Sequence, residues 1–496
     1  MRHGVGGLFL LHVNDAVYTQ KPPLWFWLAA LAGGWEGRVD EVAARLPSAF
    51  AALASLGLTA WIGRALRLSS RTVLIATAVL ATSYRFVFVA RRAQLDGVLT
   101  ACLLVAMALF LWLDRDPSAR RPTWAIATLH LALGAGALTK GPVAWLPLAI
   151  FAAFLAWERR LPDLRRIAPA WAFTLSVGPL ALWAALAVAM APPGYFDVAI
   201  VDNVLGRFFA GTAHARPFYY FLGQLPIEFL PWSAVLPLGL LWLHRASKKA
   251  SADPSSNRAA RFLICWIGLP FLFFSLSAGK RGLYLLPILP ALSIATAAGL
   301  DRALRHRRPD AVVLDGRLCT GLAAVALAQA ALFVGLGPLV LDAHKSPRPI
   351  AAGARAEIRS GEVLGVYRLA PLEPALTYYG AGQVVPIADA SALSAFLEAR
   401  RGPVVLRTRD LAALSDSTPL IEVAGFRNGD RALSLARRAT PNSPRDTPFS
   451  VPDSPRVSPE ERTRSPYALA IPPFSGTPAL PLGAHLRYSA RGPDPR

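Results

Sequence analysis

Long apolar runs dominate this sequence, and they limit the chain to folds that suit a lipid bilayer. About ten of these runs approach the roughly 20 residues that a helix needs to cross the hydrocarbon core. Inside lipid, every backbone N–H and C=O group must be satisfied within the segment, so we expect each run to be a helix. The predicted spans are 46–63, 72–90, 97–113, 123–139, 143–157, 169–191, 225–243, 262–278, 282–300 and 319–341.

The basic residues indicate the orientation of these spans. The chain of 496 residues carries a net charge of +21, although only 17% of its residues are charged. Arg and Lys gather in alternate loops, which is typical of the cytoplasmic loops of membrane proteins and excludes a nucleic-acid-binding surface. The five basic loops are 64–71, 115–121, 159–166, 245–261 and 302–317.

The sequence changes character after the last predicted span, and this change suggests four parts. Residues 1–45 are expected to form an outer-face loop with an interfacial helix, and residues 46–341 a transmembrane domain. Two strand-like segments with a helical segment between them predict a small α/β domain at 345–438, also on the outer face. Residues 439–496 are rich in Pro, Ser and Arg and are expected to be disordered.

The three cysteines, Cys102, Cys265 and Cys319, lie in or beside apolar runs and show neither metal-ligand nor disulfide spacing. They are expected to be small apolar fillers. No cofactor is required by the sequence. A divalent metal stays open, although no cluster of ligands with metal spacing is evident.

Charged residues recur at the membrane edge of the less basic face. Lys21 precedes a proline pair and an aromatic stretch, Asp96 precedes a span, and Lys140 lies in a turn with Gly141 and Pro142. Each has a simpler interpretation: Lys21 in an interfacial anchor, Asp96 as a helix cap, and Gly141 with Pro142 as turn residues. The functional interpretation is that Lys21 and Lys140 meet the phosphate of a lipid, with Asp96 as a catalytic acid or base near the bilayer edge.

Two further segments on this face combine cations with aromatic side chains. The long loop contains Arg207, His214 and Tyr219, and a tight turn before the ninth span contains Lys280 and Tyr284. The cations could hold a phosphate or diphosphate, and the rings could stack on a sugar or a prenyl chain. Alternatively these are interface residues of a solvated loop, and a single histidine such as His214 is more often structural.

In this order, the motifs resemble a known group of membrane enzymes. They are listed here from the amino terminus: Lys21-Pro22-Pro23-Leu24, Asp96, Thr139-Lys140-Gly141-Pro142, Asn203 with Arg207-Phe208, Pro217-Phe218-Tyr219, Leu230-Pro231-Trp232, and Lys280 with Tyr284–Pro290. The chain resembles the bacterial aminoarabinose-transferase and protein O-mannosyltransferase group, which are multi-spanning glycosyltransferases of the GT-C type. The resemblance covers about residues 10–440.

The resemblance implies that a sugar moves from a polyprenyl-phosphate donor to a lipid A-like or protein hydroxyl on the outer face. Fixed cations would stabilise the leaving phosphate, and a carboxylate would accept the proton of the acceptor hydroxyl. The group has a first membrane helix and an acidic loop residue ahead of the lysine motif. Met1 aligns within that loop, so we expect a truncated gene model, with Asp15 as the nearest acid. Gln20 stands where many relatives have an acid.

Two other functions use the same outward cations. A transporter or flippase of lipid-linked sugars would show internal repeats and broken helices in matching halves, and none is evident in the sequence. An inactive paralogue would bind prenyl lipid without turnover. For all three functions the sequence predicts a multi-pass protein of a bacterial inner membrane, in contact with membrane lipids, with its site on the periplasmic side.

Overall fold

The computed structural model describes residues 6–13, 16–34, 39–116, 121–199, 201, 203, 206, 215–248, 253–307, 316–337, 345–369, 372–399, 402–414 and 419–439. These residues fall into two compact units. One unit comprises Met1–His12 and Val17–Ala330, and the other comprises Val13–Ala16 and Ala331–Arg496. Each unit is described by itself below.

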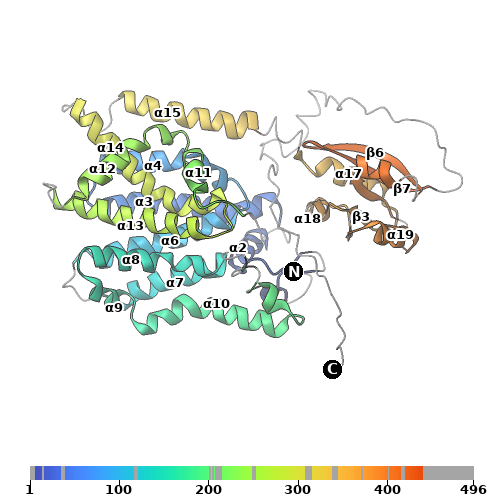
Figure 1. The fold of residues 1–496 in the computed structure, drawn as a ribbon, viewed down its shortest axis with the longest axis horizontal. Coiled ribbons are helices and arrows are strands. Elements are labelled where there is room, and N and C mark those ends of the chain that lie inside the picture. Colours follow the sequence, from blue (N-terminus) through green and yellow to red (C-terminus); the bar gives the residue numbers. More distant parts are fainter. Residues whose placement is uncertain are drawn as a thin grey trace. The chain divides into compact units, whose positions relative to one another are not determined.

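The first unit is a bundle of helices that pack lengthwise against one another (Figure 1). Short elements come first along the chain: α1 (Gly6–Phe9), β1 (His12–Val13), β2 (Ala16–Val17) and α2 (Leu24–Gly33), with Val13 and Ala16 assigned to the second unit. The next helices are α3 (Glu41–Ala65), α4 (Ser70–Ala81), α5 (Tyr84–Ala90), α6 (Leu95–Leu113), α7 (Thr123–Lys140), η2 (Pro142–Trp145), α8 (Leu146–Trp157), η3 (Leu161–Asp163) and α9 (Leu164–Ile167). The unit continues with α10 (Ala170–Met190), α11 (Tyr220–Glu228), η5 (Trp232–Ala234), α12 (Leu236–Ala246), α13 (Pro254–Leu276), η6 (Gly282–Ile288), α14 (Leu289–Arg307) and α15 (Gly316–Ala330).

Within the described residues, 6 helices are long and apolar enough to cross a membrane, or up to 7 if the bent pair α4–α5 is one span. Shorter apolar helices include Leu24–Gly33 and Pro142–Trp157. The helical membrane fold predicted from the apolar runs is therefore confirmed. The total of about ten spans stays a prediction.

Two predicted spans are broken in the structure. The run at 72–90 forms α4 and α5, which meet at an angle of 64°. At the break, the Thr82 hydroxyl donates to the Ala78 carbonyl and the Ser83 hydroxyl to the Val79 carbonyl, each at 2.6 Å, and such bonds bend helices. The run at 225–243 is likewise divided among α11, η5 and α12.

Aromatic packing fills the middle of this bundle. Phe110 stacks on Phe151 with ring centroids 4.0 Å apart, and Phe154 and Phe262 meet edge to face at 5.3 Å. These four rings come from α6, α8 and α13, and all are fully buried. Because lipid is as apolar as these rings, their close van der Waals packing, rather than removal from water, is what fixes how the three helices pack.

Helix α6 carries an acidic residue near each end, and both are buried. Asp114, at its carboxyl end, accepts hydrogen bonds from Arg160 at 2.7 Å and from Arg258. Asp96, in its first turn, pairs with Lys140 at the end of α7. The 19 residues of α6 rise about 28 Å, so these two ion pairs mark opposite ends of the bundle.

The second unit contains η7 (Ala331–Leu336) and an α/β domain. The domain comprises α17 (Arg348–Glu357), β3 (Leu364–Tyr367), α18 (Glu373–Tyr378), β4 (Val384–Ile387), α19 (Ala390–Ala399), β5 (Val404–Arg407), α20 (Thr408–Leu414), β6 (Leu420–Asn428) and β7 (Arg431–Arg438). Its sheet has the order β4-β3-β5-β7-β6, with β3 parallel to β4 and β5, and with β7 antiparallel to β5 and β6. The predicted small α/β fold is confirmed.

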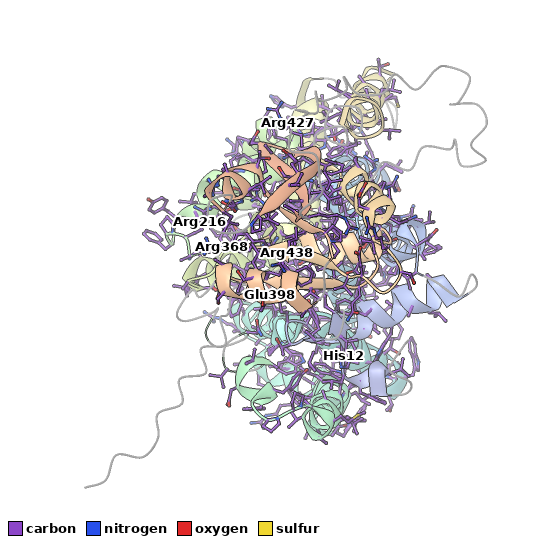
Figure 2. The ribbon with its side chains drawn as sticks, turned by 90° about the vertical axis from the view of Figure 1, so that its right-hand side faces the viewer. His12, Arg216, Arg368, Glu398, Arg427 and Arg438 are labelled. Atoms are coloured by element: carbon purple, nitrogen blue, oxygen red, sulfur yellow. The ribbon has the colours of Figure 1, made fainter. Side chains whose placement is uncertain are left out.

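Alternating residues of the central strand β5 serve two cores. Val405 packs with the residues of α17 and α18, whereas Val404 and Leu406 pack with those of α19 and α20. Helices therefore cover both faces of the sheet, which is typical of parallel strands. Exposed arginines, including Arg368 and Arg438, lie on the surface of this unit (Figure 2). The tail predicted at 439–496 lies almost wholly outside the described residues.

Candidate functional site

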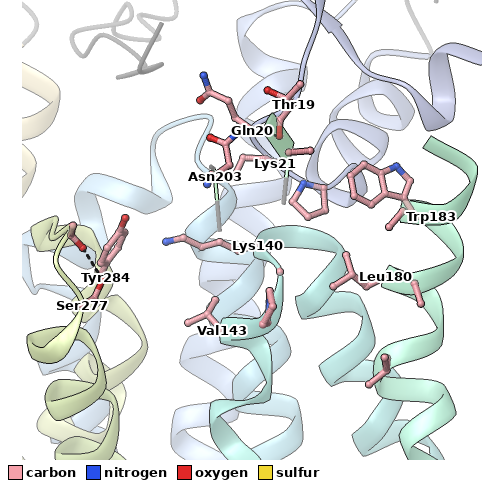
Figure 3. A pocket seen from close by; sticks show the side chains of 18 of the residues that line it. Thr19, Gln20, Lys21, Lys140, Val143, Leu180, Trp183, Asn203, Ser277 and Tyr284 are labelled. Carbon is pink, nitrogen blue, oxygen red and sulfur yellow. Dashed lines mark hydrogen bonds between the residues drawn. The ribbon is translucent and has the colours of Figure 1, made fainter. Parts of the chain in front are cut away.

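A cavity of about 590 Å³ opens within the first unit, at the end of the bundle where Asp96 and Lys140 lie. Its polar side is formed by Thr19, Gln20, Lys21, Lys140 and Asn203, and Tyr284 lies beside them (Figure 3). Segments far apart in the sequence therefore meet here: the residues before α2, the end of α7, the loop after α10 and η6. Three predicted site residues, Lys21, Lys140 and Tyr284, line the same cavity.

Lys140 is held in place by the turn that follows it. Gly141 has φ +79°, a region that residues with a side chain avoid, and its N–H bonds to the Ala137 carbonyl at 2.7 Å. This turn ends α7 and lets Pro142 begin η2. The Lys140 ammonium lies 4.5 Å from the centre of the Tyr284 ring, which is a favourable cation–π distance (Figure 3).

The Asp96 carboxylate lies behind Lys140. It pairs with the Lys140 ammonium and is 5% exposed, and it is not among the residues that line the cavity. Its place in the first turn of α6 favours a negative charge, because helix amino termini carry partial positive charge. The geometry therefore favours a role in which Asp96 orients Lys140.

The segment 19–22 and Asn203 close the polar side of the cavity. Lys21 and Pro22 come directly before α2, which Pro23 begins as its amino-terminal cap. The Asn203 amide donates to the Val198 carbonyl at 2.7 Å and reaches the Thr19 carbonyl at 3.5 Å. The loop after α10 is thus tied to the segment that carries Lys21.

An apolar wall faces these polar groups. It comprises Val177, Leu180, Trp183 and Val188 from α10, with Phe273 and Phe274 from α13. The Trp183 indole N–H donates to the Phe9 carbonyl at 2.9 Å, which leaves the ring to line the cavity. Sequence reasoning missed this wall, because α10 is apolar on all sides and its periodicity does not reveal the face that lines a site.

Lys280 takes a different place from the other predicted cations. Lys280 is 4% exposed, and its ammonium donates to the Arg216 carbonyl at 3.1 Å and to the Ser277 carbonyl. This burial lowers the pKa of Lys280 below its usual range, because desolvation disfavours the charged form. Lys280 therefore fastens the segment around Arg216 to the cavity rim formed by Ser277 and Gly279.

Tyr219 is a described candidate that does not line the cavity. Tyr219 is 57% exposed at the start of α11, where it packs on Phe218. Asp15, Arg207 and His214 lie outside the described residues. Among the described residues, no group of three or more His, Cys, Asp or Glu side chains is placed to hold a metal ion.

Comparison with known proteins identifies related sequences. A family model for dolichyl-phosphate-mannose-protein mannosyltransferases matches residues 9–191. The undecaprenyl phosphate-α-4-amino-4-deoxy-L-arabinose arabinosyl transferase of Erwinia tasmaniensis is 30% identical over 306 residues, covering 59% of this chain and 51% of the relative. That of Pseudomonas aeruginosa is 31% identical over 335 residues, covering 64% of this chain and 57% of the relative. The chain thus spans little more than half the length of these curated relatives.

Solved structures show a shared fold over most of the chain. The crystal structure of ArnT from Cupriavidus metallidurans bound to undecaprenyl phosphate superposes with a TM-score of 0.66 at 18% identity, covering 88% of this chain and 92% of that one. Its apo structure gives a TM-score of 0.63, with 87% and 90% covered. Sequence and fold therefore agree with the resemblance inferred from the motifs: this chain is similar in sequence to aminoarabinose transferases and shares the fold of the ArnT structures.

Proposed function

We propose that this protein transfers a sugar from a polyprenyl-phosphate carrier to the hydroxyl group of a lipid A-like or protein acceptor. The observation that carries the proposal is the cavity itself, which places two lysines opposite an apolar wall. The cations can bind a phosphate and the apolar wall can contact a prenyl chain, so a polyprenyl-phosphate sugar would contact both sides of the cavity. Relatives named as transferases that use undecaprenyl phosphate-aminoarabinose support this donor.

In the proposed reaction, the acceptor oxygen bonds to the anomeric carbon as the bond from that carbon to the phosphate oxygen breaks. Polyprenyl phosphate leaves with the bonding electron pair, and its negative charge grows as it leaves. Lys21 and Lys140 would stabilise that charge, and Asp96 would keep Lys140 in place for it. The base that takes the acceptor proton is proposed to be a carboxylate, with Asp15 as the candidate, because Asp96 does not line the cavity and is proposed to act through Lys140. Arg207, His214 and Tyr219 stay proposed donor-binding residues of the loop after α10.

The proposed location is a bacterial inner membrane, with the site facing the periplasm. The charge distribution supports this orientation, because Arg160 and Arg258 surround Asp114 at the end of α6 that lies away from the cavity. Arg-rich loops remain on the cytoplasmic side of membrane proteins. We propose on the same grounds that residues 1–45 and the 345–438 domain lie on the outer face, joined by the membrane domain 46–341.

The experiment is transfer of labelled sugar in reconstituted membranes. We expect the protein to move label from undecaprenyl phosphate-aminoarabinose to lipid A, or from another polyprenyl-phosphate sugar to lipid or protein. Lys21→Ala is expected to lower the transfer rate by about 100-fold, the size of effect seen when one charge-stabilising group is removed. Lys248→Ala, in a basic loop, is the matched control and should transfer as the wild type does.

Two outcomes would contradict this function. Folded protein that binds undecaprenyl phosphate but transfers no sugar from any donor tested would indicate the inactive paralogue. Movement of labelled donor lipid between leaflets without transfer to an acceptor would indicate the flippase. Equal transfer by wild type and Lys21→Ala would reject the assignment of the cavity.

A further inference from the structure

A buried ion pair that does not line the cavity lies between α5 and α11. Glu228 is fully buried, and the Arg85 guanidinium donates to its carboxylate from both Nε and Nη2. The distance from Nη2 to Glu228 Oε1 is 2.7 Å. The Gln224 amide, one turn earlier on α11, donates to the same carboxylate at 2.5 Å. The carboxylate therefore has three donors, and its geometry is fixed from two helices.

Stability alone is a poor explanation for such a pair. Removing two charges from water costs about as much as their attraction returns, so apolar residues of similar size often serve a fold equally well. The helices are also joined by other bonds: the Tyr84 N–H donates to the Leu230 carbonyl at 2.8 Å, and the Trp232 indole to the Thr82 hydroxyl at 2.9 Å. Since α5 and the end of α11 are already joined by these bonds, the main effect of the pair is to fix the orientation of the Glu228 carboxylate.

The carboxylate rests against the turn that begins η6. A methyl group on Gly282 would overlap the Glu228 carboxylate and would come within 3.0 Å of the Gln224 amide nitrogen. Gly282 is itself buried. The turn therefore has little freedom on this side, and its position follows that of the carboxylate.

Tyr284 is two residues beyond Gly282, and its N–H bonds to the Arg281 carbonyl at 2.9 Å within the same turn. Its ring contacts the Lys140 ammonium at 4.5 Å and the Phe274 ring at 5.2 Å, both on the cavity lining. We propose that Arg85 and Glu228 are a positioning pair that, through Gly282, holds Tyr284 against Lys140 for the transfer reaction. This inference rests on the proposed function for its catalytic meaning.

The first test is a double-mutant cycle on sugar transfer. Glu228→Gln keeps the shape of the side chain but removes the charge that Arg85 grips, and it should lower kcat/KM by about 10- to 100-fold, as displaced catalytic geometry does. In a Tyr284→Ala background the same change should add less than about twofold, because coupled residues are not additive. A pair that only stabilises the fold would lower activity by the same factor in both backgrounds.

Gly282→Ala tests the same contact from the other side and keeps both charges. It should lose activity as Glu228→Gln does. In a Glu228→Ala background, which already lacks the pair, Gly282→Ala should add less than about twofold further loss, because the added methyl has room. The matched control is Asp114→Asn, which disrupts a fully buried acid with two arginine partners at the far end of α6. Its effect on transfer should be independent of Tyr284.

A readout that needs no activity separates this inference from the proposed function. The extent of acylation of Lys140, divided by that of Lys21, is measured by mass spectrometry of the purified protein. This ratio should be at least about threefold higher in Glu228→Gln than in the wild type, because the Tyr284 ring no longer covers the amine. Increased Lys140 labelling in a protein that transfers no sugar would sustain the positioning role and reject the transferase. Unchanged labelling, or additive losses in the cycle with Tyr284, would overturn the positioning role.

Discussion

At the scale of single residues, the site is organised around Lys140. Gly141 ends the helix that carries it, Asp96 pairs with its ammonium, and Tyr284 covers one side of it. The cation therefore has a fixed position before any ligand arrives. Such preorganisation lets a charge stabilise a leaving phosphate without rearrangement during the reaction.

Lys140 and Asp96 should differ in their mutant kinetics. Lys140→Ala removes a proposed phosphate partner and should weaken undecaprenyl phosphate binding and lower kcat by about 100-fold. Asp96→Asn keeps the cation but releases it, so it should lower kcat by about 10- to 100-fold with a smaller change in binding. Steady-state kinetics and lipid-binding titration measure both. Full activity in Asp96→Asn would contradict a role for Asp96 in the site.

The apolar wall can be tested by filling it. Leu180→Trp places a larger ring in the cavity, where it would displace part of the prenyl chain, and should raise KM for the lipid-linked donor by about tenfold or more, which corresponds to about 1.4 kcal/mol. The matched control is Leu182→Trp, because Leu182 lies on the same helix and is 63% exposed. It should leave KM unchanged. Equal effects of both changes would place the donor elsewhere.

At the scale of elements, close backbone contacts join α12 to α14. A methyl group on Gly239 of α12 would lie 2.7 Å from the Thr296 backbone nitrogen of α14, and one on Gly299 would come still closer to the Leu238 carbonyl oxygen. Small residues at such positions let two backbones approach, which is a common source of helix association in membranes.

Gly239→Ala should therefore lower the free energy of unfolding of the detergent-solubilised protein by about 1–3 kcal/mol, because the added methyl overpacks the contact between the helices. Gly268→Ala is the matched control. An added methyl there meets no atom within 4 Å, so the change should be neutral or should stabilise α13 by up to about 1 kcal/mol. If Gly239→Ala were as stable as the wild type, α12 and α14 could not pack as closely as described.

Sequence reasoning succeeded where one physical cause acts alone and failed where several compete. Apolar length placed α3, α6, α10 and α13 within a few residues, apart from the start of α13, which lies eight residues before the predicted span at 262. It could not place the break at Thr82, because hydroxyl-to-carbonyl bonding there competes with the helix.

The same limit applies to the candidate site. Turn residues and cations at the membrane edge predicted Lys21, Lys140 and Tyr284, which the structure brings together. Apolar patterning could not identify Trp183 as a wall residue or show that Lys280 bonds to backbone carbonyls, because both depend on which distant segments become neighbours.

At the scale of the whole molecule, the α/β unit is a separate compact unit with a charged pair between its last strand and the turn before β3. The Arg437 guanidinium bonds to Glu362 at 2.7 Å and holds the pKa of that carboxyl below its usual value of 4.5. A carboxyl whose pKa is lower in the folded than in the unfolded state stabilises the fold fully at pH values above its unfolded-state pKa. This contribution disappears as the pH falls through the folded-state pKa.

Lowering the pH should therefore reduce the free energy of unfolding of this unit more in the wild type than in Glu362→Gln, which lacks the carboxylate. At neutral pH, Glu362→Gln should lower the free energy of unfolding of this unit by about 1–3 kcal/mol, the usual value of a hydrogen bond to a charged group. Pulse proteolysis of the full chain at pH values above and below 4.5 measures the difference. A difference that stayed constant with pH would rule out this carboxylate as the titrating group.

The account of the whole molecule depends on the cavity being the donor site. Photo-crosslinking with a diazirine-bearing polyprenyl phosphate in reconstituted membranes, mapped by mass spectrometry, tests this directly. We predict crosslinks at cavity residues of α10 and α13, such as Leu180 and Phe273, that are lost with excess undecaprenyl phosphate and weakened in Lys140→Ala. Crosslinks confined to lipid-exposed positions such as Leu182 and Leu272, and unaffected by competitor, would contradict the account.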